Sequence, residues 1–169
     1  MKKIVLSLIV ISPLSFASPV PFGLELGKNT ISQAKNKYHL IDAGVNKYSG
    51  GDMYQLDVNE LNVDGIESAL LIYDKRQILT AVVTSFPKEK LNVLLPTLKK
   101  KYKLIKEKIP FVGDASAKFK DDDCTILVDA PHLSFSMKLI YSKDNFLSAY
   151  DKAIAQEENA KKSQQESQL

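Results

Sequence analysis

An internal repeat constrains the fold of this chain more than any other feature of its sequence. Residues 70–82 read LLIYDKRQILTAV, and residues 138–150, which lie 68 positions later, read KLIYSKDNFLSAY. Two further pairs of segments match in the same order: 35–41 with 99–105, and 47–52 with 118–123. Three matches in one order indicate a tandem duplication, in which small loop insertions change the offset between the copies.

Each repeat unit is predicted to be one helix followed by four strands. Asn29 or Thr30 can cap the first helix, which should end near Tyr38, and the second helix is predicted over residues 91–105 with a bend at Pro96. The expected strands are 45–49, 53–58, 66–73 and 78–86 in the first unit, and 115–120, 124–129, 133–141 and 146–150 in the second. Gly50-Gly51 and Asp121-Asp122 are the expected hairpin turns.

The last of these strands has an alternative interpretation. Phe146, Tyr150 and Ile154 are spaced by four residues, which would also suit a helix that starts at Asp144. We follow the repeat and predict a strand over residues 146–150, with a helix from about Asp151.

The pattern therefore predicts an α+β fold of two tandem units, about 22–86 and 87–155. Together they should form one eight-stranded antiparallel sheet with both helices packed on one face. The other face of the sheet is then left to water or to a partner.

At the level of topology, this arrangement resembles the beta-lactamase inhibitor protein fold. That fold has two tandem units of this kind, and its concave sheet grips a target enzyme, so the resemblance implies a binding protein. The inhibitor family carries disulfides, which a chain with one cysteine cannot form. Residues 22–28 (FGLELGK) run into the capped helix and are similar to the start of the lipoprotein of the barrel-assembly machinery, another binding module.

The first 17 residues have the three parts of a secretory signal. Lys2 and Lys3 precede an apolar run, and Ser15-Phe16-Ala17 offers small residues where a signal peptidase cleaves. We expect cleavage near Ala17 and a periplasmic destination. The mature chain should be a single domain over residues 18–155, and the polar tail 156–169 should fray or be disordered.

Cysteine and charge content narrow the range of partners. Cys124 is the only cysteine, so no disulfide can form within the chain, and we expect this residue to be buried. Without Lys2 and Lys3 the formal net charge falls from +3 to +1, and Arg76 is the only arginine. Proteins that bind nucleic acids rely strongly on the guanidinium group of arginine, so we predict no nucleic-acid partner. We predict a protein partner instead, with a membrane surface as the less favoured alternative.

No group of residues has the spacing of a catalytic or metal site. Asp121-Asp122-Asp123 lacks the alternating ligands and the glycine of a calcium loop, and the two histidines, His39 and His132, fall in unrelated parts of the pattern. Cys124 directly follows the aspartates, which would raise the pKa of its thiol and suppress the reactive thiolate. We predict no enzyme activity, no metal and no cofactor.

Two groups of residues are candidates for binding. Lys99, Lys100 and Lys101 form a basic run beside an aromatic residue, although the solvated face of a helix would look the same. Tyr48 and Tyr54 flank the Gly50-Gly51 turn together with Asp52, and Tyr54 has no tyrosine counterpart in the second unit. A tyrosine in one copy alone suits recognition, but a structural cross-strand pair explains it equally well.

From these observations we expect a periplasmic, non-enzymatic binding protein that acts as an inhibitor or immunity protein against an enzyme or toxin. An envelope-assembly or membrane-surface factor and a small-molecule carrier are the alternatives.

Overall fold

A computed structural model describes residues 18–166, so the predicted signal peptide lies outside the described part of the chain. Three short 3-10 helices are present: η1 (Pro21–Gly23), η2 (Val58–Glu60) and η3 (Lys88–Lys90). The α-helices are α1 (Ile31–Lys35), α2 (Leu91–Lys101) and α3 (Asp144–Glu166). The strands are β1 (Leu40–Val45), β2 (Gly50–Leu56), β3 (Ser68–Asp74), β4 (Leu79–Pro87), β5 (Lys103–Lys108), β6 (Ala115–Asp121), β7 (Cys124–Ala130) and β8 (Ser136–Lys143).

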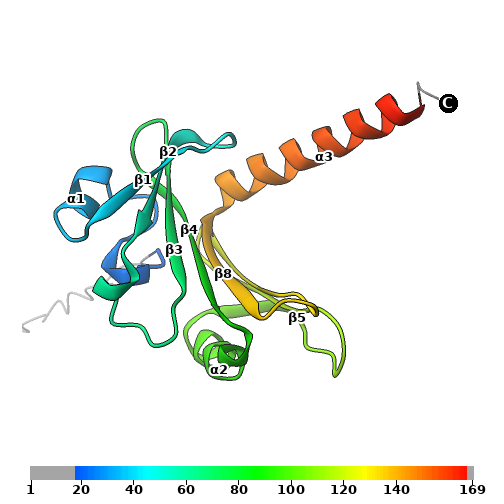
Figure 1. Cartoon of the computed structure of the whole chain (residues 1–169), viewed down its shortest axis with the longest axis horizontal. Helices are drawn as coiled ribbons and strands as arrows, with labels where there is room; N and C mark the ends of the chain where they lie inside the picture. The colour runs from blue at the N-terminus through cyan, green and yellow to red at the C-terminus, as the bar shows by residue number, and fades with distance from the viewer. Residues whose placement is uncertain (1–17, 167–169) are drawn as a thin grey trace, which may run out of the picture.

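All eight strands form one antiparallel sheet in the order β1-β2-β3-β4-β8-β7-β6-β5. The α+β class and the single eight-stranded antiparallel sheet are therefore confirmed. Strands β4 and β8 meet at the centre of the sheet, where seven residue pairs from Ala81–Ser142 to Pro87–Ser136 align. Strands β1 and β5 are the two edges (Figure 1).

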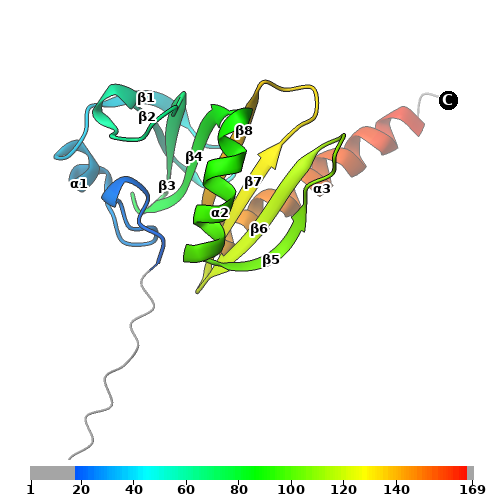
Figure 2. The same cartoon turned by 90° about the horizontal axis from the view of Figure 1, so that it is seen from below.

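The hydrophobic core lies on the face of the sheet that α1 and α2 cover. Ile31 and Ala34 of α1 pack with Leu71 and Tyr73 of β3 in one buried cluster. Leu95 and Leu98 of α2 belong to a second cluster with apolar residues of β6, β7 and β8. In Figure 2, α2 lies in front of the sheet and α3 behind it, so α3 leaves from the opposite face.

Local sequence explains both core-facing helices. Thr30 caps α1, because its hydroxyl accepts from the Gln33 amide while the Gln33 side chain accepts from the Thr30 amide. Helix α2 runs as one element through Pro96, which is exposed, and ends at Tyr102 with the backbone in the extended region. The chain then turns directly into β5.

The structure corrects two predicted elements. Residues 103–105, which were expected to end a helix, belong to the edge strand β5. The predicted strand 146–150 is wrong, because this segment belongs to α3. Strand β8 already has β4 on one side and β7 on the other, so no edge is free for a strand that follows it. The polar segment 156–166, expected to fray or be disordered, continues the same helix.

In two of the three sequence matches, the two matched segments have different structures. Residues 70–82 span β3 and β4, whereas residues 138–150 span β8 and the start of α3. The predicted turn at Gly50-Gly51 is wrong, because both glycines are the first residues of β2, whereas Asp121-Asp122 lies where β6 ends and the turn to β7 begins. The predicted strand 45–49 is also wrong, since Val45 ends β1 and residues 46–49 form the turn between β1 and β2.

Gly51 is required where it lies. A Cβ atom at this position would come within 2.3 Å of the Tyr73 carbonyl oxygen, a distance that no side chain tolerates. The close approach of the β2 and β3 backbones at this point depends on that glycine.

Candidate functional site: the open face of the sheet

The sheet face opposite α1 and α2 presents one continuous row of aligned side chains. Directly paired residues in antiparallel strands point to the same face, so the strand registers identify the row. Reading from β2 to β5, the row is Gln55, Leu70, Val83, Ile140, Leu127, Lys118 and Lys106. Its middle is apolar and its far end is basic. We call this surface the open face.

The apolar part of the row is only partly covered. Leu70, Val83, Ile140 and Leu127 are all half-buried, whereas Ile126 and Val128, which point to the helix-covered face of the same strand, are buried. Adjacent strands are about 4.8 Å apart, so the four apolar side chains extend over about 14 Å. Partly exposed apolar side chains in the four central strands distinguish this face from an ordinary solvated one.

The first turns of α3 form a wall at one end of the open face. Phe146, Leu147 and Tyr150 face the sheet across a hollow of about 230 Å³, which Val83, Leu127 and Ile140 also line. Tyr48 in the β1–β2 turn supports this wall, because its ring meets that of Tyr150 edge to face at a centroid distance of 4.7 Å. Beyond this contact α3 projects away from the body of the protein (Figure 1).

A polar contact fastens the base of α3 to the sheet. The Asp144 carboxylate accepts a hydrogen bond of 2.7 Å from the Thr125 hydroxyl and forms an ion pair with Lys120. Burial alone would raise the pKa of the Asp144 carboxyl, but the hydrogen bonds from Lys120 and Thr125 outweigh it and hold the pKa below its ordinary value. The wall is thus anchored by a charged group at neutral pH.

Lysines dominate the β5–β6 end of the open face. The registers put Lys103, Lys106 and Lys108 of β5 on this face with Lys118 and Lys120 of β6. Among the residues that the structure describes, only Lys120 of these five forms an ion pair. Asp129 of β7, which aligns with Ser116 and Lys138, adds a carboxylate to the rows of this face. This end of the surface therefore favours negatively charged groups.

The predicted tyrosine site is not one surface. Tyr48 stands on the open-face side next to α3, but Tyr54 packs against the core cluster of α1 and contacts the Tyr73 ring at 6.0 Å. Asp52, half-buried on β2, aligns with Val45 of β1. Of the three residues, the structure brings only Tyr48 to the open face.

The predicted lysine site occupies the last turn of α2, on the far side of the sheet. Lys99, Lys100 and Lys101 are exposed there. Lys99 forms an ion pair with Glu107 of β5 at 2.7 Å, and the Lys101 ammonium lies over the Tyr102 ring. This lysine cluster and the open face are thus two separate basic surfaces.

Cys124 is buried, as predicted, with no exposed surface. Burial raises the pKa of its thiol to about 12, with a smaller opposing effect from the Lys143 ammonium. His39 and His132 lie in different regions, and His132 accepts a hydrogen bond from the Gly113 amide. Within residues 18–166, no three metal-ligating side chains are grouped as a metal site would require.

Sequence reasoning missed most of the open face. The signal was present as alternation: lysines recur at every second residue in 106–108 (KEK) and 118–120 (KFK). The apolar row was not visible, because four strands from both halves of the chain contribute one residue each, and their registers depend on the assembled sheet.

Helices that could cross a membrane are not found among the described residues. No protein-family model, curated protein or solved structure matches this chain.

Proposed function

We propose that this chain is a periplasmic, non-enzymatic binding protein that holds a partner protein on the open face. The observation that carries the proposal is the half-buried apolar row Leu70, Val83, Ile140 and Leu127 in the centre of the sheet. Helix α3 packs against this row through Phe146, Leu147 and Tyr150 but leaves it half-exposed, whereas a face that met only water would carry polar side chains there.

The chemistry of the row defines the partner that it would fit. An apolar segment of the partner would lie against the middle of the row. Carboxylates about 5 and 10 Å further along would meet Lys118 and Lys106, which are one and two strand spacings from Leu127. Since the topology-level resemblance is to an enzyme inhibitor, an inhibitor or immunity protein against an enzyme or toxin is the role that we propose.

The size of the hollow favours a protein partner over a small molecule. Pockets for small molecules usually measure roughly 300–1,000 Å³ and enclose most of the ligand. The hollow beside α3 measures about 230 Å³ and opens onto the rest of the face. A broad, partly apolar surface with a charged end is more typical of a protein interface.

Affinity capture from an envelope extract tests the proposal. Immobilised mature protein is compared with a Leu127→Asp variant, which puts a charge into the apolar row, and with Val93→Asp, which makes the same change at an exposed position of α2. The retained partner is then identified and titrated in solution. We expect Val93→Asp to bind as the wild type does and Leu127→Asp to bind at least about tenfold more weakly.

A charge-reversed variant tests the basic end of the row. Lys106→Glu combined with Lys118→Glu should weaken the complex and reduce its dependence on salt. Equal retention by all variants, or no protein retained at low and moderate salt, would contradict the proposal. Selective loss with Lys100→Glu would instead assign binding to the lysine cluster of α2, the surface of the envelope-assembly alternative.

We also infer that the two halves are copies of one unit. Both halves have a helix followed by four consecutive antiparallel strands, and the strand order is mirrored about the β4–β8 pair. The match between residues 35–41 and 99–105 supports this, since each segment runs from a helix end into the first strand. An experimental structure in which residues 31–87 do not superpose on residues 91–143 would rule it out.

A further inference from the structure

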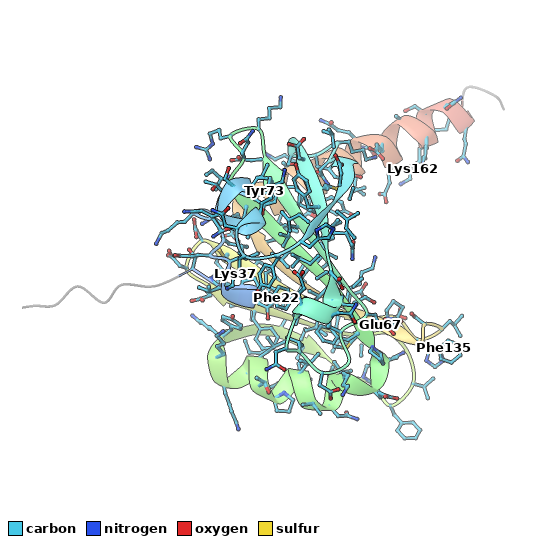
Figure 3. The ribbon with its side chains drawn as sticks, turned by 60° about the vertical axis from the view of Figure 1, so that its left-hand side comes forward. Phe22, Lys37, Glu67, Tyr73, Phe135 and Lys162 are labelled. Carbon is cyan, nitrogen blue, oxygen red and sulfur yellow. The ribbon has the colours of Figure 1, made fainter. Side chains whose placement is uncertain are left out.

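Two neighbouring loops carry the most exposed apolar side chains of the described chain. The β5–β6 loop contains Phe111, and the β7–β8 loop contains Leu133 and Phe135, with relative exposures of 105%, 94% and 95%. Ile109 and Val112 in the first loop are also exposed. Figure 3 shows Phe135 at the edge of the molecule, far from the buried Tyr73. We call these five residues the loop tips.

The loops are fastened to each other and to the sheet. The Gly113 amide donates to His132 Nδ1 at 3.3 Å, and the His132 amide donates to the Asp114 carboxylate at 2.8 Å. The Lys88 amide donates to the Phe135 carbonyl at 2.7 Å, and its ammonium donates to two further carbonyls of the same loop. The backbones of the two loops are therefore positioned before any partner arrives, which lowers the entropy cost of binding.

The shape of this surface indicates its partner. An exposure near 100% means that Phe111, Leu133 and Phe135 hardly contact one another, so they form separate projections with no groove or flat patch between them. A protein partner would need a matching pocket for each projection, whereas lipid chains are fluid and close around any apolar shape. A surface with apolar projections and polar residues at their base suits the boundary between lipid chains and headgroups.

The base of the loop tips has this polar character. Lys88, Asp114 and His132 lie there as partners of the loop backbone. Lys108 immediately precedes the first loop, and Lys138 lies near the start of β8. The lysines are offset by Asp114 and by Asp129, so the apolar tips, more than net charge, would supply the affinity.

We propose that the loop tips are a membrane-docking surface, which inserts Phe111, Leu133 and Phe135 into the interface of a lipid bilayer. Strand β8 runs from these loops to the start of α3, so the docked protein would direct α3 away from the bilayer (Figure 1). The open face would then stay free, and the protein could hold its partner at a membrane surface.

Co-sedimentation with vesicles tests this proposal. The mature protein is mixed with vesicles of phosphatidylcholine, with and without phosphatidylglycerol, at low and high salt. We expect it to bind both, and to remain bound at high salt, because burial of apolar surface is not screened. Each of Phe111→Ala and Phe135→Ala should weaken binding about tenfold, and Val93→Ala, at an exposed apolar position on α2, should not.

Three outcomes would overturn the proposal. The first is that the wild type binds neither kind of vesicle, and the second is that the variant with both phenylalanines replaced by alanine binds as well as the wild type. The third outcome is that the wild type binds only the vesicles with phosphatidylglycerol and loses this binding at high salt. Self-association that is lost in the double variant, without vesicle binding, would assign the loop tips to a second copy of the chain. The Leu127→Asp variant, which tests partner binding on the open face, should bind vesicles as the wild type does. Failure of the membrane proposal can therefore be distinguished from failure of the partner proposal.

Discussion

At the scale of single residues, Cys124 illustrates how burial removes reactivity. The aspartates that precede it in sequence have a minor effect on its pKa, and the main cause of the rise to about 12 is burial. We predict that the native protein does not react with a thiol-specific disulfide reagent at neutral pH, and that one thiol per chain reacts after unfolding in urea. Reaction of the native protein at the rate of a free cysteine would contradict the buried position of this residue.

A second prediction at the scale of single residues concerns Asp144 and the stability of the fold at acidic pH. The pKa values of Asp74, Asp123 and Asp144 are all lowered in the folded protein, each with hydrogen bonds that favour the charged form. A lowered pKa stabilises the fold above the ordinary aspartate pKa of about 3.9, and this contribution is lost as the pH falls through the folded value. The free energy of unfolding, measured in urea, should therefore decrease between about pH 5 and pH 3.

The control for this prediction is Asp144→Asn, which keeps the shape but not the charge. This variant should be less stable than the wild type at neutral pH and should lose less stability on acidification. An identical pH dependence in the two proteins would show that the contact of Asp144 with Lys120 and Thr125 does not stabilise the fold.

At the scale of elements, α3 has two parts with different roles. Its first turns contact the sheet through Phe146, Leu147 and Tyr150, whereas residues 155–166 are exposed throughout, and Lys162 lies far from the sheet in Figure 3. The exposed part contacts the body through an ion pair between Glu157 and Lys47. Exposed ion pairs contribute little, so deletion of residues 156–169 should leave the free energy of unfolding almost unchanged.

Replacement of Phe146 by Ala is the matched comparison. This change removes the Phe146 part of the contact between α3 and the apolar row. It should destabilise the protein by about 1–3 kcal/mol, which urea unfolding measures. A larger loss from the deletion than from Phe146→Ala would contradict the division of α3 into an anchored first part and an exposed second part.

The elements also show which parts of the fold the sequence predicts. The α2 helix and strand β4 were predictable, because leucines at helical spacing and a run of Val, Ile and Thr are local signals. The predictions for β5 and for the start of α3 were wrong, because the local pattern of these residues suits either a helix or a strand. What decides between the two is the place of each segment in the sheet: β5 has a free edge beside β6, whereas the segment after β8 has none.

At the scale of the whole molecule, the sheet joins two core clusters that lie under different helices. The β4–β8 pair connects them, and the Thr84 hydroxyl of β4, buried at this junction, donates to the Leu139 carbonyl of β8 at 2.7 Å. We predict that the protein unfolds as one cooperative unit. Hydrogen exchange followed in β3 and in β6 should report the same unfolding free energy, and clearly different values would show that the halves unfold separately.

The open face is also a property of the whole molecule, since both halves of the chain contribute to it. Photo-cross-linking in living cells tests its role most directly, with a photo-reactive benzoylphenylalanine placed at position 127 or 118 of the open face, or at position 93 or 100 of α2. We predict that one partner protein is cross-linked from positions 127 and 118 and not from the α2 positions. Cross-linking from α2 alone, or from none of the four positions, would contradict binding on the open face.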